Sequence, residues 1–157
     1  MEQCGLFDRF IKRQEKMYPV ALEELKAGKK CGHWIWYTLP QIRGLARSRK
    51  AFVFGIPNAE YARQYLAHPI LGPRLIQCCQ TILTHKEKTA RQILGDLDAL
   101  KLRSCATLFA MVSREGSVFH QVLDQFYEGR KDPFTLGLVS GTILDMTYRK
   151  FLVAVDL

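Results

Sequence analysis

Residues 69–83 read PILGPRLIQCCQTIL, and this stretch indicates the fold class more clearly than any other part of the sequence. The apolar residues that recur in it with helical spacing are Ile70, Leu71, Leu75, Ile76, Cys79, Ile82 and Leu83. This spacing is typical of one amphipathic helix whose apolar face must be buried against other elements. The helix before it is expected to end at His68, because a residue that precedes proline avoids the helical region.

Start and stop signals on either side of this stretch divide the chain into further helices. Asn58 and Ser117 are good N-cap residues, and Asp132 stands before a proline, which favours the first position of a helix. Gly28 and Gly95 are typical of helix ends. The sequence therefore predicts helices over most of its length.

Two signals give more specific expectations. Pro19 stands where a second helix could begin, after an apolar stripe that starts at Leu6. Asp96 or Asp98 is expected to cap the helix that contains LKLRSCATLFAMV (100–112).

Only two segments look strand-like, AFVFGI (51–56) and FLVAV (151–155), and both could also be buried helix. The chain shows no internal repeat, low-complexity tract or change of composition that would mark a linker. We therefore predict an all-α, or mainly α, fold with a single compact multihelical domain over residues 1–157.

Composition restricts the class of protein. The chain has 157 residues, 48% hydrophobic and 24% charged, as soluble globular proteins do, and the sequence shows no apolar run of the length that a bilayer span needs. Its N-terminus carries charges where a secretory signal would be apolar. We expect an intracellular protein, cytoplasmic or nuclear, without a membrane partner.

The five cysteines form no metal-binding pattern and are expected to be free thiols in a reducing compartment. They are Cys4, Cys31, Cys78, Cys79 and Cys105. A metal site built from Cys31, His33 and His68 would fit no known ligand spacing. We expect no metal and no cofactor.

Positive charge is concentrated in the first third of the chain. Residues 1–50 hold 11 Lys and Arg against 5 Asp and Glu, whereas residues 51–157 hold 12 against 10. An excess of this kind favours nucleic acids, phosphorylated metabolites or acidic protein surfaces as partners. It is equally compatible with a solvated basic surface that keeps the protein soluble.

Four strings, in this order, resemble a known family: HWIWYTLPQIRGL (33–45), YLAHPILGPRL (65–75), LKLRSCATLF (100–109) and DPFTLGL (132–138). The family is a widespread group of uncharacterised proteins, classed as a domain of unknown function and sometimes mislabelled calpastatin. The resemblance covers about residues 6–139 and implies a single all-helical domain, like that of a mycobacterial hypothetical protein. It implies no activity, because none is established for the family.

The chain departs from the usual family pattern at several positions. Leu39 stands where phenylalanine is usual, and Cys31 and Cys105 stand where small residues are usual. The resemblance therefore gives no reason to expect cysteine chemistry. Residues 140–157 lie beyond it and form a C-terminal extension.

The first string combines a histidine with large aromatic rings. His33, and His68 in the second string, could act as a general base or orient a ligand, or could simply tie a loop by hydrogen bonding. Trp34 and Trp36 have the spacing of an extended segment, which would point both rings the same way. The rings could pack in the core or stack on a base or a sugar. Gln41 could present its amide to a ligand.

The third string carries polar groups near an expected helix start. Lys101 and Arg103 could bind an anion together with the first N–H groups of the helix, or could pair with Asp96 or Asp98. Thr107 lies one turn after Arg103. Arg74 is a further candidate to reach a shared pocket.

Three classes of function follow from these observations. The first is a pocket that binds, and could hydrolyse, an anionic small molecule of nucleotide or ADP-ribose type. The second is a protein-interaction or scaffold module whose motifs are all structural. The third is a nucleic-acid-binding protein, which the basic first third favours although no nucleic-acid-binding motif is present.

Overall fold

The computed structural model describes residues 5–142, and within them every regular element is a helix. In chain order these are α1 (Asp8–Ala27), α2 (Ile35–Thr38), α3 (Arg49–Val53), α4 (Ala59–Ala67), α5 (Leu71–Leu83), α6 (Ala90–Leu94), α7 (Asp96–Met111), α8 (Val118–Tyr127) and α9 (Pro133–Ser140). The predicted all-α fold is confirmed. The predicted strand-like segment FLVAV and most of the C-terminal extension lie outside the described residues.

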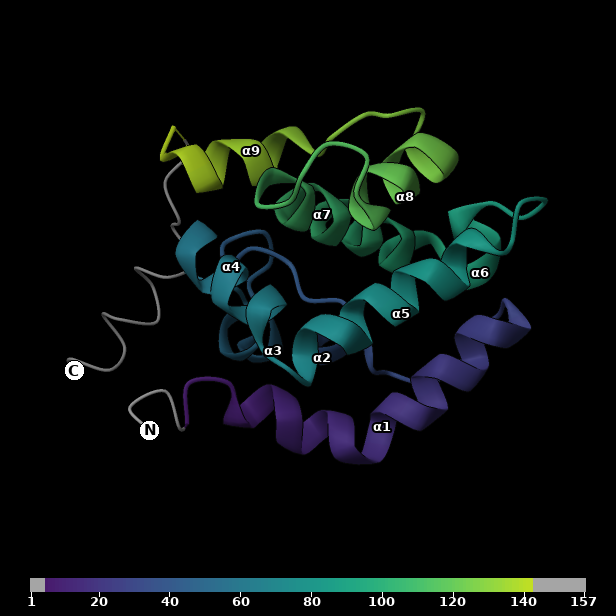
Figure 1. The fold of residues 1–157 in the computed structure, drawn as a ribbon, viewed down its shortest axis with the longest axis horizontal. Helices are drawn as coiled ribbons and strands as arrows, with labels where there is room; N and C mark the ends of the chain where they lie inside the picture. Colours follow the sequence, from purple (N-terminus) through teal and green to yellow (C-terminus); the bar gives the residue numbers. More distant parts are fainter. Residues whose placement is uncertain (1–4, 143–157) are drawn as a thin grey trace.

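Helix α5, which contains the stretch PILGPRLIQCCQTIL, lies at the centre of the fold. It packs against α1 on one side and against α4 and α8 on others, and α7 packs against α4, α6, α8 and α9. Figure 1 shows α5 crossing the middle of the molecule, with α1 along one edge and α9 along the opposite edge. The largest side chains that these helices bury completely are Trp34, Tyr65, Phe10, Phe109 and Phe119.

The junction of α4 and α5 depends on a glycine. A Cβ atom added at Gly72 would lie only 2.0 Å from the backbone carbonyl oxygen of Leu66, so only glycine allows this close approach. His68 ends α4, as its position before proline predicted, and its Nδ1 accepts hydrogen bonds from the backbone N–H groups of Ile70 (3.1 Å) and Leu71 (3.3 Å). His68 therefore satisfies two backbone N–H groups at the start of α5, whose N-cap residue is Ile70.

Helix α1 is continuous, so the expectation of a new helix at Pro19 is wrong. Proline lacks the N–H group that would bond to the carbonyl of Glu15, four residues earlier. Both residues are exposed, so water can satisfy that carbonyl. The helix ends at Gly28, as predicted, with the glycine in the left-handed region (φ 74°).

The expected cap of α7 is also wrong, because Gly95 both ends α6 and precedes α7. Its backbone (φ 88°, ψ 168°) lies in a region that is almost closed to other residues. Asp96 and Asp98 consequently fall inside the first turn of α7. The other predicted caps, Asn58, Ser117 and Asp132, are confirmed, and each accepts a hydrogen bond from the third residue of its helix.

The segment AFVFGI (51–56) is helical only at its start, where it completes α3. Ile56 then forms an isolated parallel bridge with Ile42, in which Ile56 N donates to Gln41 O at 2.9 Å and Arg43 N donates to Ile56 O at 2.8 Å. This bridge fixes the loop that carries Gln41. In residues 5–142, no helix is long and apolar enough to cross a membrane.

Candidate functional site

One carboxylate ties the loop between α1 and α2 to α1. Glu24 Oε1 accepts hydrogen bonds from the backbone N–H groups of Cys31 (2.7 Å) and Gly32 (2.9 Å). It also accepts one from the indole Nε1 of Trp34 at 2.9 Å. Burial acts to raise the pKa of Glu24, but these hydrogen bonds together lower it. Trp34 is completely buried in this arrangement, while His33 beside it is exposed.

Trp34 and Trp36 point in different directions, so the expectation of an extended segment is wrong. Residues Ile35–Thr38 form α2, with Trp34 at its N-cap position. Side chains two positions apart on a helix diverge by about 200°. Trp34 therefore enters the core, while Trp36 is only partly buried and faces a cleft.

A buried lysine connects the same loop to α7. Lys30 Nζ lies 2.7 Å from Asp98 Oδ2, and its side chain is only 6% exposed. Asp98 Oδ1 accepts a hydrogen bond from Lys101 Nζ at 2.8 Å, and Lys101 Nζ also lies 4.5 Å from the centre of the Trp36 ring. Burial acts to raise the pKa of Asp98, but the two ammonium groups lower it. Asp98 is thus an ionised link between two lysines.

A cleft of about 650 Å³ lies between α7, the start of α9 and the loop that leads from α2 to α3. It is lined by Trp36, Gln41, Leu45, Ala46, Arg47, Ser48, Leu97, Leu100, Lys101, Arg103, Ser104, Asp132, Pro133 and Phe134. Four of these residues, at positions 97, 100, 101 and 104, form one face of α7. The cleft therefore combines the first, third and fourth strings of the sequence.

Arg103 and Thr107 hold the loop between α8 and α9 in place. Arg103 Nε donates to Arg130 O, and its Nη2 donates to Lys131 O, both at 2.8 Å. Thr107 Oγ1 accepts a hydrogen bond from the backbone N–H of Asp132 at 2.9 Å. Arg103 borders the cleft as well, whereas Thr107 is completely buried behind it.

Asp132, the carboxylate at the cleft, is already heavily engaged. Its Oδ2 accepts hydrogen bonds from Ser104 Oγ (3.1 Å), Thr135 N (3.1 Å) and Thr135 Oγ1 (2.5 Å). These contacts fix the start of α9 against α7. The third string supplies Ser104 and the fourth supplies Asp132 and Thr135, so the two strings meet at this junction.

Gln41 has a buried side chain whose amide is unused. The residue is only 7% exposed and lines the cleft. Its backbone carbonyl accepts the hydrogen bond from Ile56, but its side-chain amide has no hydrogen-bond partner among residues 5–142. The amide atoms open into the cleft, so this group is available to hydrogen-bond to water or to a ligand there.

Of the residues selected from the sequence, the structure brings Trp36, Gln41, Lys101 and Arg103 to one cleft. The others lie elsewhere. Trp34 and Thr107 are in the core, His33 is on the surface and His68 hydrogen-bonds to the start of α5. Arg74, on α5, lies 5.0 Å from the centre of the Tyr18 ring and 3.5 Å from Gln14 Oε1.

The other lining residues were not among the sequence candidates, and they include one cation and three large apolar side chains: Arg47, Leu97, Leu100 and Phe134. Leu97, Leu100 and Phe134 are 73%, 62% and 63% exposed, which is unusual for large apolar side chains. The spacing of Leu97 and Leu100 on the same side of α7 as Lys101 was a usable signal. Arg47 could not be distinguished from the other arginines of the basic first third.

The described residues contain no group of three or more His, Cys, Asp or Glu side chains that could hold a metal ion. Cys78, Cys79 and Cys105 are buried, and burial raises the pKa of each thiol, that of Cys78 to about 12. Cys31 is exposed. None of these four cysteines lines the cleft.

Fold and cleft together define an all-helical domain with one partly apolar, positively charged cleft between its helices. The chain belongs to a family described as "Protein of unknown function (DUF1810)", whose model matches residues 6–139. This confirms the resemblance seen in the four strings. The crystal structure of the conserved hypothetical protein Rv1873 from Mycobacterium tuberculosis is similar, with a TM-score of 0.83 and 39% sequence identity. The match covers 85% of this chain and 96% of that one. No curated protein matched the chain.

Proposed function

We propose that the cleft binds a small anionic molecule that carries a flat ring, of nucleotide or ADP-ribose type. The observation that carries this proposal is the side-chain amide of Gln41, which opens into the cleft from an almost fully buried residue and has no hydrogen-bond partner among the described residues. An amide offers both donors and an acceptor, so it suits the edge of a heterocyclic base or a sugar hydroxyl. Binding of such a group would give this amide a partner that residues 5–142 do not supply.

Charge favours an anion. Arg47, Lys101 and Arg103 line the cleft, and the only carboxylate among the lining residues is that of Asp132. Asp132 is bound to Ser104 and Thr135, and Arg103 is held by two carbonyl groups of the adjacent loop. Arg103, and Lys101 through its ion pair with Asp98, are therefore positioned before a ligand arrives, which lowers the entropy cost of binding.

Size and apolar surface favour a ligand with a ring. A volume of about 650 Å³ lies within the range of small-molecule sites. Trp36 and Phe134 supply aromatic faces in the cleft, and Leu97 and Leu100 supply aliphatic surface. A base or a nicotinamide could pack on this surface while its phosphate groups meet the cations.

The proposal concerns binding and assigns no catalytic group. His33 and His68, the candidate general bases, lie outside the cleft. Asp132 is already occupied, because one of its carboxylate oxygens accepts three hydrogen bonds from Ser104 and Thr135. Hydrolysis of the ligand would need a group from the ligand itself or a water molecule that these residues position.

Isothermal titration with ADP-ribose, AMP and adenosine tests the proposal. We expect ADP-ribose or AMP to bind and adenosine to bind at least about tenfold more weakly, because it lacks the phosphate that meets the cations. Gln41→Leu should weaken binding by about tenfold without lowering stability, since the amide has no partner to lose. Gln64→Leu, on the surface of α4, is the matched control. The proposal would be rejected if none of the three compounds bound, or if Gln41→Leu bound them with the same affinity as the wild type.

One observation favours the interaction module as a second candidate for the same cleft. Leu97, Leu100 and Phe134 are each more than half exposed, and exposed apolar groups of this size are common at protein interfaces. This candidate predicts that the protein self-associates through the cleft. Sedimentation of the wild type and of Leu100→Asp tests this self-association. The wild type should associate, and the introduced charge should abolish the association. A monomeric wild type would exclude self-association.

A further inference from the structure

A second cavity, of about 590 Å³, lies between α1, α2 and the end of α3. It is lined by Arg9, Lys12, Arg13, Lys16, Met17, Tyr37, Val53 and Phe54. Trp36 and Tyr37 are neighbours in α2, but Trp36 faces the cleft and Tyr37 faces this cavity. The two sites share no lining residue.

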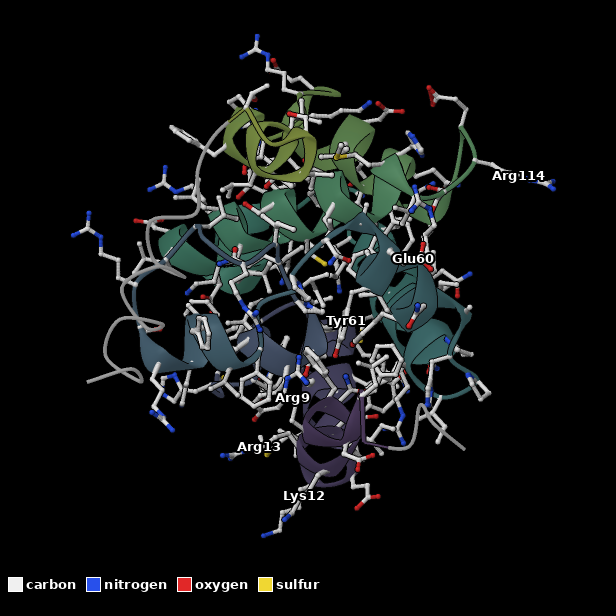
Figure 2. All side chains as sticks on the ribbon, turned by 90° about the vertical axis from the view of Figure 1, so that its left-hand side faces the viewer. Arg9, Lys12, Arg13, Glu60, Tyr61 and Arg114 are labelled. Carbon is white, nitrogen blue, oxygen red and sulfur yellow. The ribbon has the colours of Figure 1, made fainter. Side chains whose placement is uncertain are left out.

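Four cations form one face of α1 at this cavity. Arg9, Lys12, Arg13 and Lys16 have the spacing i, i+3, i+4 and i+7, which places them on the same side of a helix. Figure 2 shows Lys12 and Arg13 projecting outward from α1. Lys12, Arg13 and Lys16 form no ion pair with any residue in the described part of the chain. Their charges are therefore not neutralised by an ion pair within residues 5–142.

Arg9 is held rigidly at one end of this row. Its Nε donates to Val53 O at 2.6 Å, and its Nη1 donates to Leu6 O at 3.1 Å. Its guanidinium carbon lies 5.5 Å from the centre of the Tyr61 ring, and Figure 2 shows the two side chains next to each other. A charged group fixed by neutral carbonyls retains its full charge for an external partner.

Tyr37 provides an independent indication of a ligand. The residue is only 5% exposed, yet its hydroxyl has no hydrogen-bond partner among residues 5–142. Its ring packs on Phe54 at 5.4 Å between ring centres, which fixes its orientation at the cavity. Burial raises the pKa of Tyr37, while nearby Arg13 acts to lower it, so the hydroxyl stays protonated and can donate a hydrogen bond. The hydroxyl opens into the cavity, so a ligand bound there can accept a hydrogen bond from it.

We propose that this cavity is a second anion site, which binds a compact polyphosphorylated ligand. Seven residues separate Arg9 from Lys16, which corresponds to a row of charge about 10 Å long on a helix. One phosphate group would meet only part of that row, whereas a chain of phosphates can meet all four cations. The Tyr37 hydroxyl would donate to one of the phosphate oxygens beside Arg13.

The surroundings of the row favour a compact ligand over a nucleic-acid strand. Asp8 and Glu15 are exposed and each directly precedes one of the cations, so they lie about 100° around α1 from that cation. These carboxylates border the positive row along one side. A long polyanion would have to pass close to them, but a ligand that fits within the cavity would not.

Titration of the full chain with sodium tripolyphosphate at constant ionic strength tests this site. We expect saturable binding of one molecule, and Lys12→Gln/Arg13→Gln/Lys16→Gln should weaken it by at least about 30-fold. The control Lys29→Gln/Lys86→Gln/Arg114→Gln removes the same charge from other exposed positions and should retain binding. Figure 2 shows Arg114 far from Lys12.

Tyr37→Phe separates a specific site from general attraction. It removes only the unpaired hydroxyl, so we expect about tenfold weaker tripolyphosphate binding with no decrease of the unfolding midpoint. The proposal would be overturned if Tyr37→Phe bound tripolyphosphate as tightly as the wild type, or if the two triple variants lost the same amount of affinity. So would tighter binding of single-stranded oligonucleotides whose affinity rises with their length, because that result would assign the row to nucleic acid.

Discussion

Replacement of Asp98 by asparagine should destabilise the protein strongly, because Asp98 neutralises a buried lysine. Lys30 Nζ is 2.7 Å from Asp98 Oδ2, and the Lys30 side chain is only 6% exposed. Asp98→Asn keeps the shape of the side chain but removes its charge. Lys30 could then donate only to neutral acceptors, namely the asparagine amide oxygen and the backbone carbonyl of Gly32.

The structure sets the size of this effect. Removal of one partner of a buried ion pair typically costs about 3–5 kcal/mol, since the other charge stays buried and unpaired. Asp98 is 16% exposed and Lys101 is 22% exposed, so some water reaches the network and the lower value applies. We expect a loss of about 3 kcal/mol, which corresponds to a decrease in Tm of about 6–12 °C for a chain of this size.

Urea unfolding of four proteins measures the effect: wild type, Asp98→Asn, Lys30→Met and the double variant. The double variant should be more stable than Asp98→Asn alone, because the buried charge has been removed together with its partner. The same midpoint for wild type and Asp98→Asn would refute the assignment of Lys30 as a buried structural residue. A double variant no more stable than Asp98→Asn would refute the coupling between the two.

The pH dependence of the same variants follows from the lowered pKa of Asp98. A carboxyl group whose pKa is lower in the folded state contributes stability that is complete above its unfolded pKa, about 3.9, and is lost as the pH falls through its folded pKa. The stability difference between wild type and Asp98→Asn should therefore be constant near neutral pH and should shrink below about pH 4. A difference that persists unchanged at pH 2 would contradict this explanation.

Three further predictions concern the fold. Gly72→Ala should destabilise the protein by about 3 kcal/mol, because its Cβ would lie 2.0 Å from the Leu66 carbonyl oxygen and α4 and α5 would have to separate; an unchanged urea midpoint would contradict this. Arg103→Met should cost about 2 kcal/mol and speed amide hydrogen exchange around residues 130–135, through loss of two hydrogen bonds to that loop; unchanged exchange there would argue against the assigned role. In a Cys4→Ser background, a thiol reagent should label Cys31 in the native protein, while Cys78, Cys79 and Cys105 react only on unfolding; rapid modification of two or more thiols would disprove this.

The helices could be predicted from local patterns where one residue decides the outcome. The caps at Asn58, Ser117 and Asp132 and the stops at Gly28 and His68 follow from the chemistry of single side chains. The beginning of α7 could not be predicted this way. Gly95 occupies the N-cap position in a backbone conformation that favours glycine, and Asp96 and Asp98 lie inside the first turn instead of capping it. Pro19 misled for a related reason, since its cost depends on whether water reaches the free carbonyl.

The candidate site was only partly predictable, because the sequence does not say which of several similar residues is buried. Lys29 and Lys30 are adjacent, yet Lys29 is exposed and Lys30 is buried against Asp98. The different directions of the Trp34 and Trp36 side chains follow from the helical conformation of α2, which the sequence did not predict. The roles of His68 and Thr107 depend on contacts across the fold or at a helix start, which no spacing in the sequence reveals.

The most direct test of the cleft follows the side-chain amide of Gln41 itself. In a two-dimensional NMR spectrum of the ¹⁵N-labelled protein, saturation with the tightest-binding nucleotide or ADP-ribose should shift the Gln41 side-chain NH₂ signals, since the ligand becomes their hydrogen-bond partner. The NH₂ signals of Gln64, which already donates to Glu60, should stay in place. A ligand that saturates the protein while the Gln41 signals do not move would contradict the assignment of the cleft as the binding site.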